Sequence, residues 1–221
     1  MKEPNFLRPE ILVHPTIPKP MHGINPRTIK GKSWWDVVRK EAAAENNNCC
    51  WACGVHKSRA MFHKWLEGHE CYDIDYETGR IEMRELTSLC HACHNFIHSG
   101  RVLSQCSSGI ISPRRADKIF RHGFSILNDA GITPHIHSML NFLLFQNRES
   151  EDIIAIIEDR GYSVSDLEKD DVAWQDWHLI VDGEKHFSPF KDYKAWYNYY
   201  LDEQSNHPPT VRLHERIPNT D

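Results

Sequence analysis

Hydrophobic and polar residues alternate along this chain in a pattern that predicts a mixture of strands and helices. A polar, turn-rich stretch from Asp73 to Gly79 separates two segments of strand-like pattern, which predicts antiparallel strands at 62–72 and 80–89. Apolar residues at helical spacing and capping residues predict the other elements. The predicted helices cover residues 33–44, 91–99, a segment that begins at Pro113, 134–147, 151–160 and 192–203, and two more short strands flank Asp182-Gly183.

This order of elements predicts an α+β fold with four parts along the chain. Six prolines interrupt residues 1–30, so we expect residues 1–32 to form an extended N-terminal arm. Residues 33–123 hold the central strand pair with its flanking helices. Residues 124–203 are acidic and rich in aromatic side chains, and we expect a small helical or α+β module there. Residues 204–221 are predicted to be a tail.

Two Cys-x-x-Cys pairs carry the clearest chemical signal. Cys50 and Cys53 form the first pair, Cys90 and Cys93 the second, and four thiolates at this spacing suit a closed, tetrahedral zinc site with a structural role. Disulfides are the alternative, but the cysteine count of 7 is odd and no apolar signal peptide is recognisable. We expect the remaining cysteines to be ordinary thiols: Cys49, Cys71 and Cys106.

Three histidines close to these pairs form a second candidate site. His94 and His98 stand four residues apart, so both imidazoles leave the same face if the segment is helical. Together with His69 they could hold an ion that keeps open positions for water or a phosphate oxygen. Magnesium, manganese, nickel and zinc all remain candidates for this second ion. The alternative is that these histidines only pack or hydrogen-bond near the zinc pairs.

Charge is distributed unevenly between the two halves of the chain. Residues 1–123 carry 18 Lys and Arg against 13 Asp and Glu, whereas residues 124–221 carry 8 against 18. A basic half that holds the metal motifs predicts that a polyanion contacts that half only. The sequence has no apolar run long enough to span a bilayer, so we expect a cytoplasmic protein without a membrane partner.

The segment from Cys50 to Arg101 resembles a known nuclease family. A knuckle, a strand pair, a second knuckle and a helix follow one another as in a treble-clef finger, and the motif Leu89-Cys-His-Ala-Cys93-His94-Asn95-Phe-Ile-His98 is similar to that of HNH endonucleases with a four-cysteine zinc site. The resemblance implies a zinc-stapled treble-clef or ββα-metal finger. It also implies hydrolysis of nucleic-acid phosphodiester bonds by an activated water, with a single divalent ion that stabilises the pentacoordinate phosphate and the leaving oxygen. His94 and His98 would then be ligands of that ion.

The first strand of the family carries a metal ligand followed by the general base, commonly Asp-His or His-His. This chain has His69-Glu70 there, so that His69 would bind the ion and Glu70 would activate water. Alternatively, Gly68-His69 occupies the pair and His69 is the base. Glu85 stands where the family often has an asparagine that orients the base. The resemblance therefore predicts four catalytic residues: His69, Glu70, His94 and His98.

Basic residues near the motif are candidates for contacts with phosphates. Arg84 and Arg101 are closest to it, and the helix that begins at Pro113 would carry further cations at offsets of three and four, namely Arg114, Arg115, Lys118 and Arg121. We expect DNA as the substrate. The rival interpretation is a treble-clef module without turnover, which binds nucleic acid or contacts a partner protein through its acidic, aromatic C-terminal module.

Overall fold

A computed structural model describes residues 2–15, 17–162 and 172–206, and it has the mixed α+β architecture that the sequence predicts. The chain divides into two compact units that are interleaved in sequence. Unit 1 comprises residues 1–16, 36–71 and 85–169, and unit 2 comprises residues 17–35, 72–84 and 170–221. The predicted tail, 204–221, lies mostly outside the described residues, as do residues 163–171 of the predicted acidic module.

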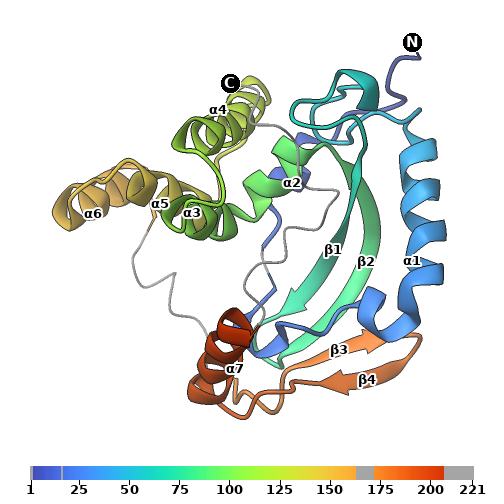
Figure 1. Cartoon of the computed structure of the whole chain (residues 1–221), viewed down its shortest axis with the longest axis vertical. Coiled ribbons are helices and arrows are strands. Elements are labelled where there is room, and N and C mark those ends of the chain that lie inside the picture. The colour runs from blue at the N-terminus through green and yellow to red at the C-terminus, as the bar shows by residue number, and fades with distance from the viewer. Residues whose placement is uncertain (1, 16, 163–171, 207–221) are drawn as a thin grey trace. The chain divides into compact units, whose positions relative to one another are not determined.

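Both units draw on one long helix and one β-hairpin. Helix α1 (Pro26–Glu45) and strands β1 (Glu67–Asp75) and β2 (Arg80–Leu89) each begin in one unit and end in the other (Figure 1). The hairpin turn is shaped by Asp75, whose carboxylate accepts hydrogen bonds from the backbone N–H groups of Glu77 and Thr78. Gly79 closes the turn at a φ of 70°, a conformation that favours glycine.

The other elements of unit 1 are mostly helical. They are the 3-10 turns η1 (Pro9–Val13) and η3 (Lys57–Arg59), and the helices α2 (His91–Ile97), α3 (Ser99–Ser107), α4 (Pro113–Asp129), α5 (Ile136–Phe145) and α6 (Ser150–Asp159). Helix α4 begins where the sequence predicts, with Ser112 accepting a hydrogen bond from the backbone N–H of Arg115 as its N-cap. Helices α5 and α6 pack on each other through a small apolar cluster that includes Met139 and Ile157.

The main core of unit 1 lies between α2 and α4. Phe96 and Phe120 are fully buried there, and the N-terminal segment adds Ile11 and Leu12, which are equally buried. The predicted N-terminal arm is therefore packed into unit 1 over this stretch. Gly123 of α4 faces Phe96, because a Cβ atom built on Gly123 would lie 2.2 Å from the Phe96 ring. The absence of a side chain at this position is what allows the two helices to approach closely.

Unit 2 is built around an extension of the sheet. Strand β3 (His178–Val181) pairs in parallel with β2, and β4 (Glu184–Phe187) pairs antiparallel with β3, so that the strand order is β1-β2-β3-β4. The predicted Asp182-Gly183 turn joins β3 to β4, and both of its residues have positive φ. Trp177 and Leu179 are fully buried in the core of this unit. The 3-10 turn η2 (Lys19–Met21) and helix α7 (Tyr193–Asn206) complete it.

The largest differences from the sequence prediction concern three element boundaries in the first half of the chain. Helical residues begin at Pro26 rather than Ser33, with a break at Gly31, whose φ of 85° is not helical. The first strand begins at Glu67 rather than at 62. The helix predicted to stop before Gly100 instead pauses at His98, with φ −88° and ψ 43°, and then continues as α3. Within the described residues, no helix is both long enough and apolar enough to cross a membrane.

The contact between Gly123 and Phe96 predicts opposite effects for two glycine-to-alanine changes. Gly123→Ala adds a methyl group that would clash with the closely packed ring of Phe96. We expect this change to destabilise unit 1 by about 1–3 kcal/mol. Gly100→Ala is the matched control, because its Cβ would lie 3.6 Å from Asn141 Nδ2, an ordinary contact, and alanine favours the helix by up to about 1 kcal/mol. Urea unfolding of both variants measures the difference, and equal stabilities would contradict this packing.

A half-buried histidine in unit 2, His22, predicts a specific pH dependence. The indole N–H of Trp196 donates to Nδ1 of His22 at 3.1 Å, and burial, aided by the charge of Lys19, lowers the pKa of His22. The unfolded chain therefore binds a proton at His22 more readily than the folded chain, and stability falls as the pH falls below about 6.5. We expect His22→Gln, which keeps an acceptor but does not titrate, to lose less stability than the native protein between pH 7 and 5. Identical pH slopes in urea unfolding would contradict this prediction.

Candidate metal centre

The first cysteine pair sits on a tight turn just before η3. The backbone N–H of Gly54 donates to the carbonyl oxygen of Cys50 at 2.9 Å, and the N–H of Cys50 donates to the carbonyl of Val55 at 2.9 Å. Gly54 has a φ of 71°, and a Cβ atom there would lie 2.7 Å from Leu7 Cδ2. Glycine therefore suits this position for two reasons, the backbone conformation and the space, and the turn directs both thiols of the pair to the same side.

The second cysteine pair lies at the start of α2. Cys90 is the N-cap residue, and Cys93 follows in the first turn. The four ligand atoms of Cys50, Cys53, Cys90 and Cys93 all lie within 4.8 Å of one another. Cys53 Sγ and Cys90 Sγ are 3.8 Å apart, which matches the edge of about 3.8 Å in a tetrahedron with zinc–sulfur bonds of about 2.3 Å. The predicted four-cysteine group is thus assembled, and it could hold a zinc ion.

The electrostatics of this group also fit a cation. Burial opposes ionisation of Cys50, but hydrogen bonds from the three neighbouring thiols outweigh it and lower the pKa of Cys50. Hydrogen bonding to Cys50 and Cys53, together with burial, raises the pKa of Cys93 well above its usual value. One thiolate therefore hinders ionisation of the others. A dication is the species that would allow all four thiols to ionise together.

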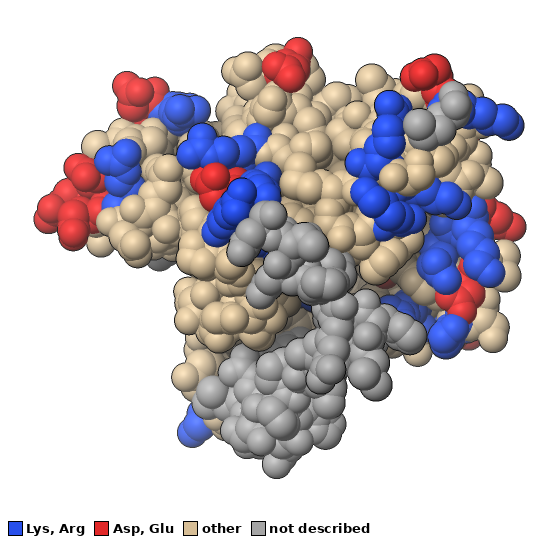
Figure 2. Space-filling view, turned by 45° about the horizontal axis from the view of Figure 1, so that its top comes forward, with Lys and Arg blue, Asp and Glu red and all other residues tan. Residues whose placement is uncertain are grey.

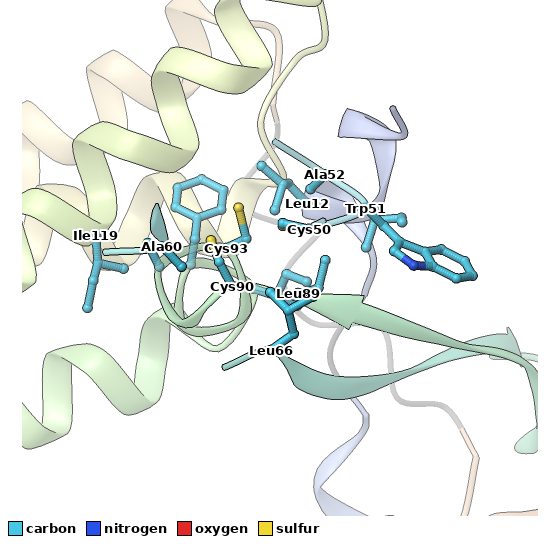
Figure 3. Close-up of a cluster of buried hydrophobic side chains, with 14 of the residues drawn as sticks. Leu12, Cys50, Trp51, Ala52, Ala60, Leu66, Leu89, Cys90, Cys93 and Ile119 are labelled. Carbon is cyan, nitrogen blue, oxygen red and sulfur yellow. The ribbon is translucent and has the colours of Figure 1, made fainter. Parts of the chain in front are cut away.

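The surroundings of the four thiols are largely apolar. Figure 3 shows Cys50, Cys90 and Cys93 among the buried side chains of unit 1, with Leu12, Leu89 and Ile119 close by. Water is therefore largely excluded from the sulfur atoms, as is typical of a structural zinc site. The other cysteines lie outside this group and form no disulfide: Cys49, Cys71 and Cys106.

Helix α4 places a histidine, His122, beside the four-cysteine group. His122 Nε2 lies 3.5 Å from Cys93 Sγ and 4.0 Å from Cys90 Sγ. An imidazole N–H at this distance can donate to a thiolate and offset part of its charge. His122 stands three residues after the buried Ile119, so its position beside the apolar stripe of α4 is the signal that could have revealed this inward orientation.

The three predicted histidines also converge. His69 projects from β1, His94 lies in α2, and His98 is the residue between α2 and α3. Each offers one ligand nitrogen within 4.8 Å of the others, and the ring centroids of His94 and His98 are 4.8 Å apart. The backbone N–H of His98 still donates to the carbonyl of His94, at 3.3 Å. The i, i+4 relation that places both rings on one side is therefore kept although the regular helix ends at Ile97.

Burial keeps this histidine group in the form that binds metals. His69 is 6% exposed, and burial, followed by the influence of His94 and His98, lowers its pKa well below the usual value. Burial, then His94 and Arg101, lowers the pKa of His98 to about 3. Both imidazoles are therefore neutral near pH 7, and neutral imidazole is the ligand that divalent transition metals require.

Glu70 and Glu85 occupy different surroundings from this histidine group. His69 and Cys71 are buried and Glu70 between them is half-buried, so the alternation along β1 directs Glu70 toward the opposite face from His69. Glu85 forms two hydrogen bonds with Arg8, at 2.7 Å each, with one guanidinium nitrogen on each carboxylate oxygen. The guanidinium group of Arg8 thus balances the negative charge of Glu85.

The sequence analysis missed a carboxylate beside the histidines. Glu67 lies two residues before His69, and its Oε1 is 2.7 Å from both His63 Nε2 and His91 Nδ1, while its Oε2 forms an ion pair with His94 Nδ1. Burial alone would raise the pKa of Glu67, but the bonds from these histidines outweigh it and hold the pKa far below its usual range. The period of two along a strand places Glu67 on the same face as His69, and this was the available signal.

The predicted phosphate-binding residues are spread over both units. Arg84 belongs to unit 2, where it forms an ion pair with Asp73 at 3.7 Å. Arg101 of α3 is exposed and close enough to His98 to influence its pKa. On α4, Arg121 pairs with Asp117, and Arg115 turns inward to His91 Nε2 at 2.9 Å, whereas Arg114 is exposed and Lys118 is half-buried. Figure 2 shows Lys and Arg side chains gathered in groups on one face of the molecule.

Comparison with known proteins adds no family assignment. The chain matches no protein-family model, no curated protein and no solved structure. The interpretation of this centre therefore depends on the geometry of its own residues.

The four-cysteine group predicts that one tightly held zinc ion stabilises unit 1. We expect Cys93→Ser to lose this ion and to unfold at a much lower temperature, because structural zinc contributes on the order of 10 kcal/mol in small zinc-binding domains. Cys106→Ser is the matched control, since Cys106 is a free thiol outside the group. Zinc content and thermal unfolding measure both effects, and a Cys93→Ser protein with its full zinc content would refute the assignment.

Proposed function

We propose that this protein is a metal-dependent endonuclease of the HNH kind, which hydrolyses phosphodiester bonds of nucleic acid, with DNA as the preferred substrate. The observation that carries the proposal is the convergence of His69, His94 and His98 next to the four-thiol group. Two groups of such different character suit two different tasks. Thiolates hold a closed structural ion, whereas three imidazoles leave positions open for water and for a phosphate oxygen.

The residues present fit a divalent ion at the histidine group. Three imidazoles, partly or fully buried, supply the donor set, and such an ion would polarise a phosphodiester oxygen and lower the pKa of a bound water. Magnesium, manganese, nickel and zinc are the candidate ions, and nitrogen ligands favour the transition metals among them. Free cysteines throughout the chain are in keeping with a cytoplasmic setting, where thiols stay reduced.

Two residues remain candidates for accepting the proton of the attacking water. Glu70 is the next residue of β1 after His69, and to serve as the base its carboxylate would have to reach the bound water around the edge of this strand. His69 could act instead if the ion is held mainly by His94 and His98. Glu70→Gln separates these cases, because it removes the base at Glu70 while it leaves all three imidazoles in place.

Cationic side chains of unit 1 could position the substrate backbone. Arg101 is the best supported of them, because it is exposed and lies close to His98. Arg114 and Lys118 of α4 could add further phosphate contacts that do not depend on sequence. Arg115 is less suited to this task, since it is held by His91 and lies over the Phe62 ring at 4.7 Å.

A second candidate is a zinc-binding module without turnover. Two observations favour this module: Glu70 faces away from His69, and Glu85 is paired with Arg8. Neither glutamate is therefore directed toward the histidine group, as the corresponding residues of HNH endonucleases would be. Its binding surface for a protein partner would be α7, where Tyr193, Tyr197 and Tyr199 are exposed. This alternative predicts a single tight zinc ion and no cleavage.

Cleavage of supercoiled plasmid tests the proposal directly. We expect nicking that depends on magnesium, manganese, nickel or zinc and that falls to background in His98→Ala, because a ligand of the working ion is lost. The matched control is His137→Ala, an exposed histidine of α5 outside the group, which should cut normally. The absence of nicking by folded, zinc-loaded protein with every metal would refute the nuclease and favour the binding module.

A further inference from the structure

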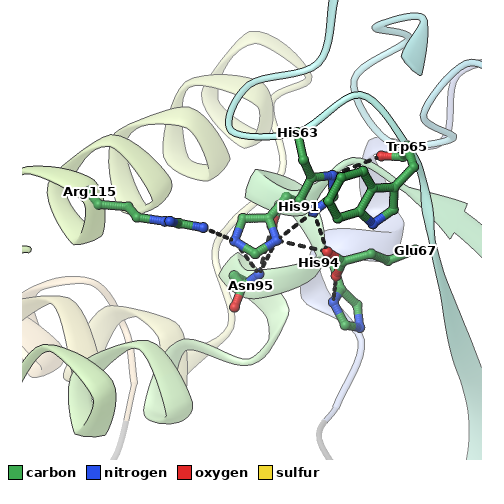
Figure 4. A network of polar contacts seen from close by, with 7 residues as sticks. All are labelled: His63, Trp65, Glu67, His91, His94, Asn95 and Arg115. Atoms are coloured by element: carbon green, nitrogen blue, oxygen red, sulfur yellow. Dashed lines mark hydrogen bonds and ion pairs between the residues drawn. The ribbon is translucent and has the colours of Figure 1, made fainter. Parts of the chain in front are cut away.

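A chain of polar side chains connects helix α4 to one of the candidate metal ligands. Arg115 of α4 contacts His91, His91 contacts Glu67, and Glu67 contacts His94 (Figure 4). All four side chains belong to unit 1, and His91, Glu67 and His94 are 19%, 22% and 16% exposed. Their hydrogen bonds are therefore largely shielded from competition by water.

The direction of each hydrogen bond in this chain follows from Arg115. A guanidinium group can only donate, so His91 Nε2, which lies 2.9 Å from Arg115 Nη2, must accept. Neutral His91 then carries its proton on Nδ1 and donates it to Glu67 Oε1, 2.7 Å away. Glu67 Oε2 forms an ion pair with His94 Nδ1, and because a carboxylate can only accept, this contact places a proton on Nδ1 of His94. The other nitrogen of His94, Nε2, is left with its lone pair.

We propose that Arg115, His91 and Glu67 form a positioning relay that fixes the proton of His94 on Nδ1 and so keeps Nε2 available as a metal ligand. The relay rests on the metal-binding part of the proposed function and not on nuclease activity. A carboxylate that holds the far nitrogen of a metal-binding histidine is a common arrangement, and its loss typically weakens metal binding 10–100-fold. Here His91 and Arg115 extend the arrangement beyond the carboxylate of Glu67.

The relay also argues against a further metal ion at His63, Glu67 and His91. Ligand atoms of these three residues lie within 4.8 Å of one another, so their spacing alone would allow an ion. For His91 to bind it through Nδ1, however, its proton would have to move to Nε2, where Arg115 already presents a donor. His63 instead reinforces the carboxylate, because its Nε2 lies 2.7 Å from Glu67 Oε1 and can donate to it.

The relay predicts how glutamine would sit in place of Glu67. An amide has one acceptor oxygen and one donor NH2 group. Because Arg115 keeps His91 as a donor toward residue 67, the amide oxygen must face His91 and the NH2 group must face His94. The proton of His94 then moves to Nε2, the nitrogen that should bind the metal. We therefore expect Glu67→Gln to bind a second metal ion 10–100-fold more weakly than the native protein.

A double variant separates this relay from a merely structural role. Arg115→Met frees His91 to change its tautomer, so that the glutamine of Glu67→Gln can turn its oxygen back toward His94. We expect the double variant Glu67→Gln, Arg115→Met to bind the second ion more tightly than Glu67→Gln alone. A purely structural loss would make the double variant equal to or weaker than the single one, and that result would overturn the proposal.

The measurements use full-length protein that already carries zinc on its thiols. Cobalt(II) titration, followed by calorimetry and visible absorption, gives the affinity of the histidine group, and Glu82→Gln, on an exposed part of β2, is the matched control. Long-range proton–nitrogen NMR of the native protein without the second ion tests the relay without any variant. Protons on Nδ1 of both His91 and His94 support it, and a proton on Nε2 of His94 overturns it.

Failure of the relay and failure of the nuclease give different results. Weak cobalt binding in Glu67→Gln with rescue in the double variant supports the relay even if native protein never cuts DNA. Conversely, a protein that cuts DNA but binds cobalt equally well with and without Glu67 would keep the proposed function and refute the relay.

Discussion

Four cysteine thiols gathered at one point, which repel one another once they ionise, are the constraint on which unit 1 depends. Cys50, Cys53, Cys90 and Cys93 are drawn together from a loop and from the start of α2, and most of their surroundings are apolar. A dication would convert this repulsion into attraction and tie the loop, the hairpin and the helix to one point. The histidine group depends on the same tie, because His94 follows Cys93 directly, and any shift of Cys93 would move His94 as well.

Helix α4 supports both groups from one face. Arg115 and His122 are seven residues apart, which is about two helical turns, and they flank the buried Ile119. His122 contacts the thiols, and Arg115 contacts the histidine–glutamate network. The close approach of α4 to α2 at Gly123 brings both side chains within reach. The stability of unit 1 and the arrangement of both candidate metal groups therefore depend on the same contact between α2 and α4.

The sequence allowed the local parts of this site to be predicted, but not the way in which they are combined. Cys-x-x-Cys spacing and the four-residue offset of His94 and His98 are local geometric rules, and both groups assemble as those rules require. The inward turns of Arg115 and His122 were not predicted, because a basic helix face has the same pattern whether its cations meet water or buried partners. Glu67 was missed because its importance comes from three histidines that lie apart from it in sequence or on another element. The interleaving of the two units depends on tertiary contacts that no local pattern encodes.

Anomalous diffraction at the zinc edge would test the central claim, that the thiols and the imidazoles form two separate metal groups. Crystals of protein purified without added metal should show one strong peak about 2.3 Å from the four Sγ atoms. A soak in cobalt should add a second peak, visible at the cobalt edge, among the imidazoles of His69, His94 and His98. A peak shared between sulfur and imidazole ligands, or a disulfide in place of the first peak, would contradict the account.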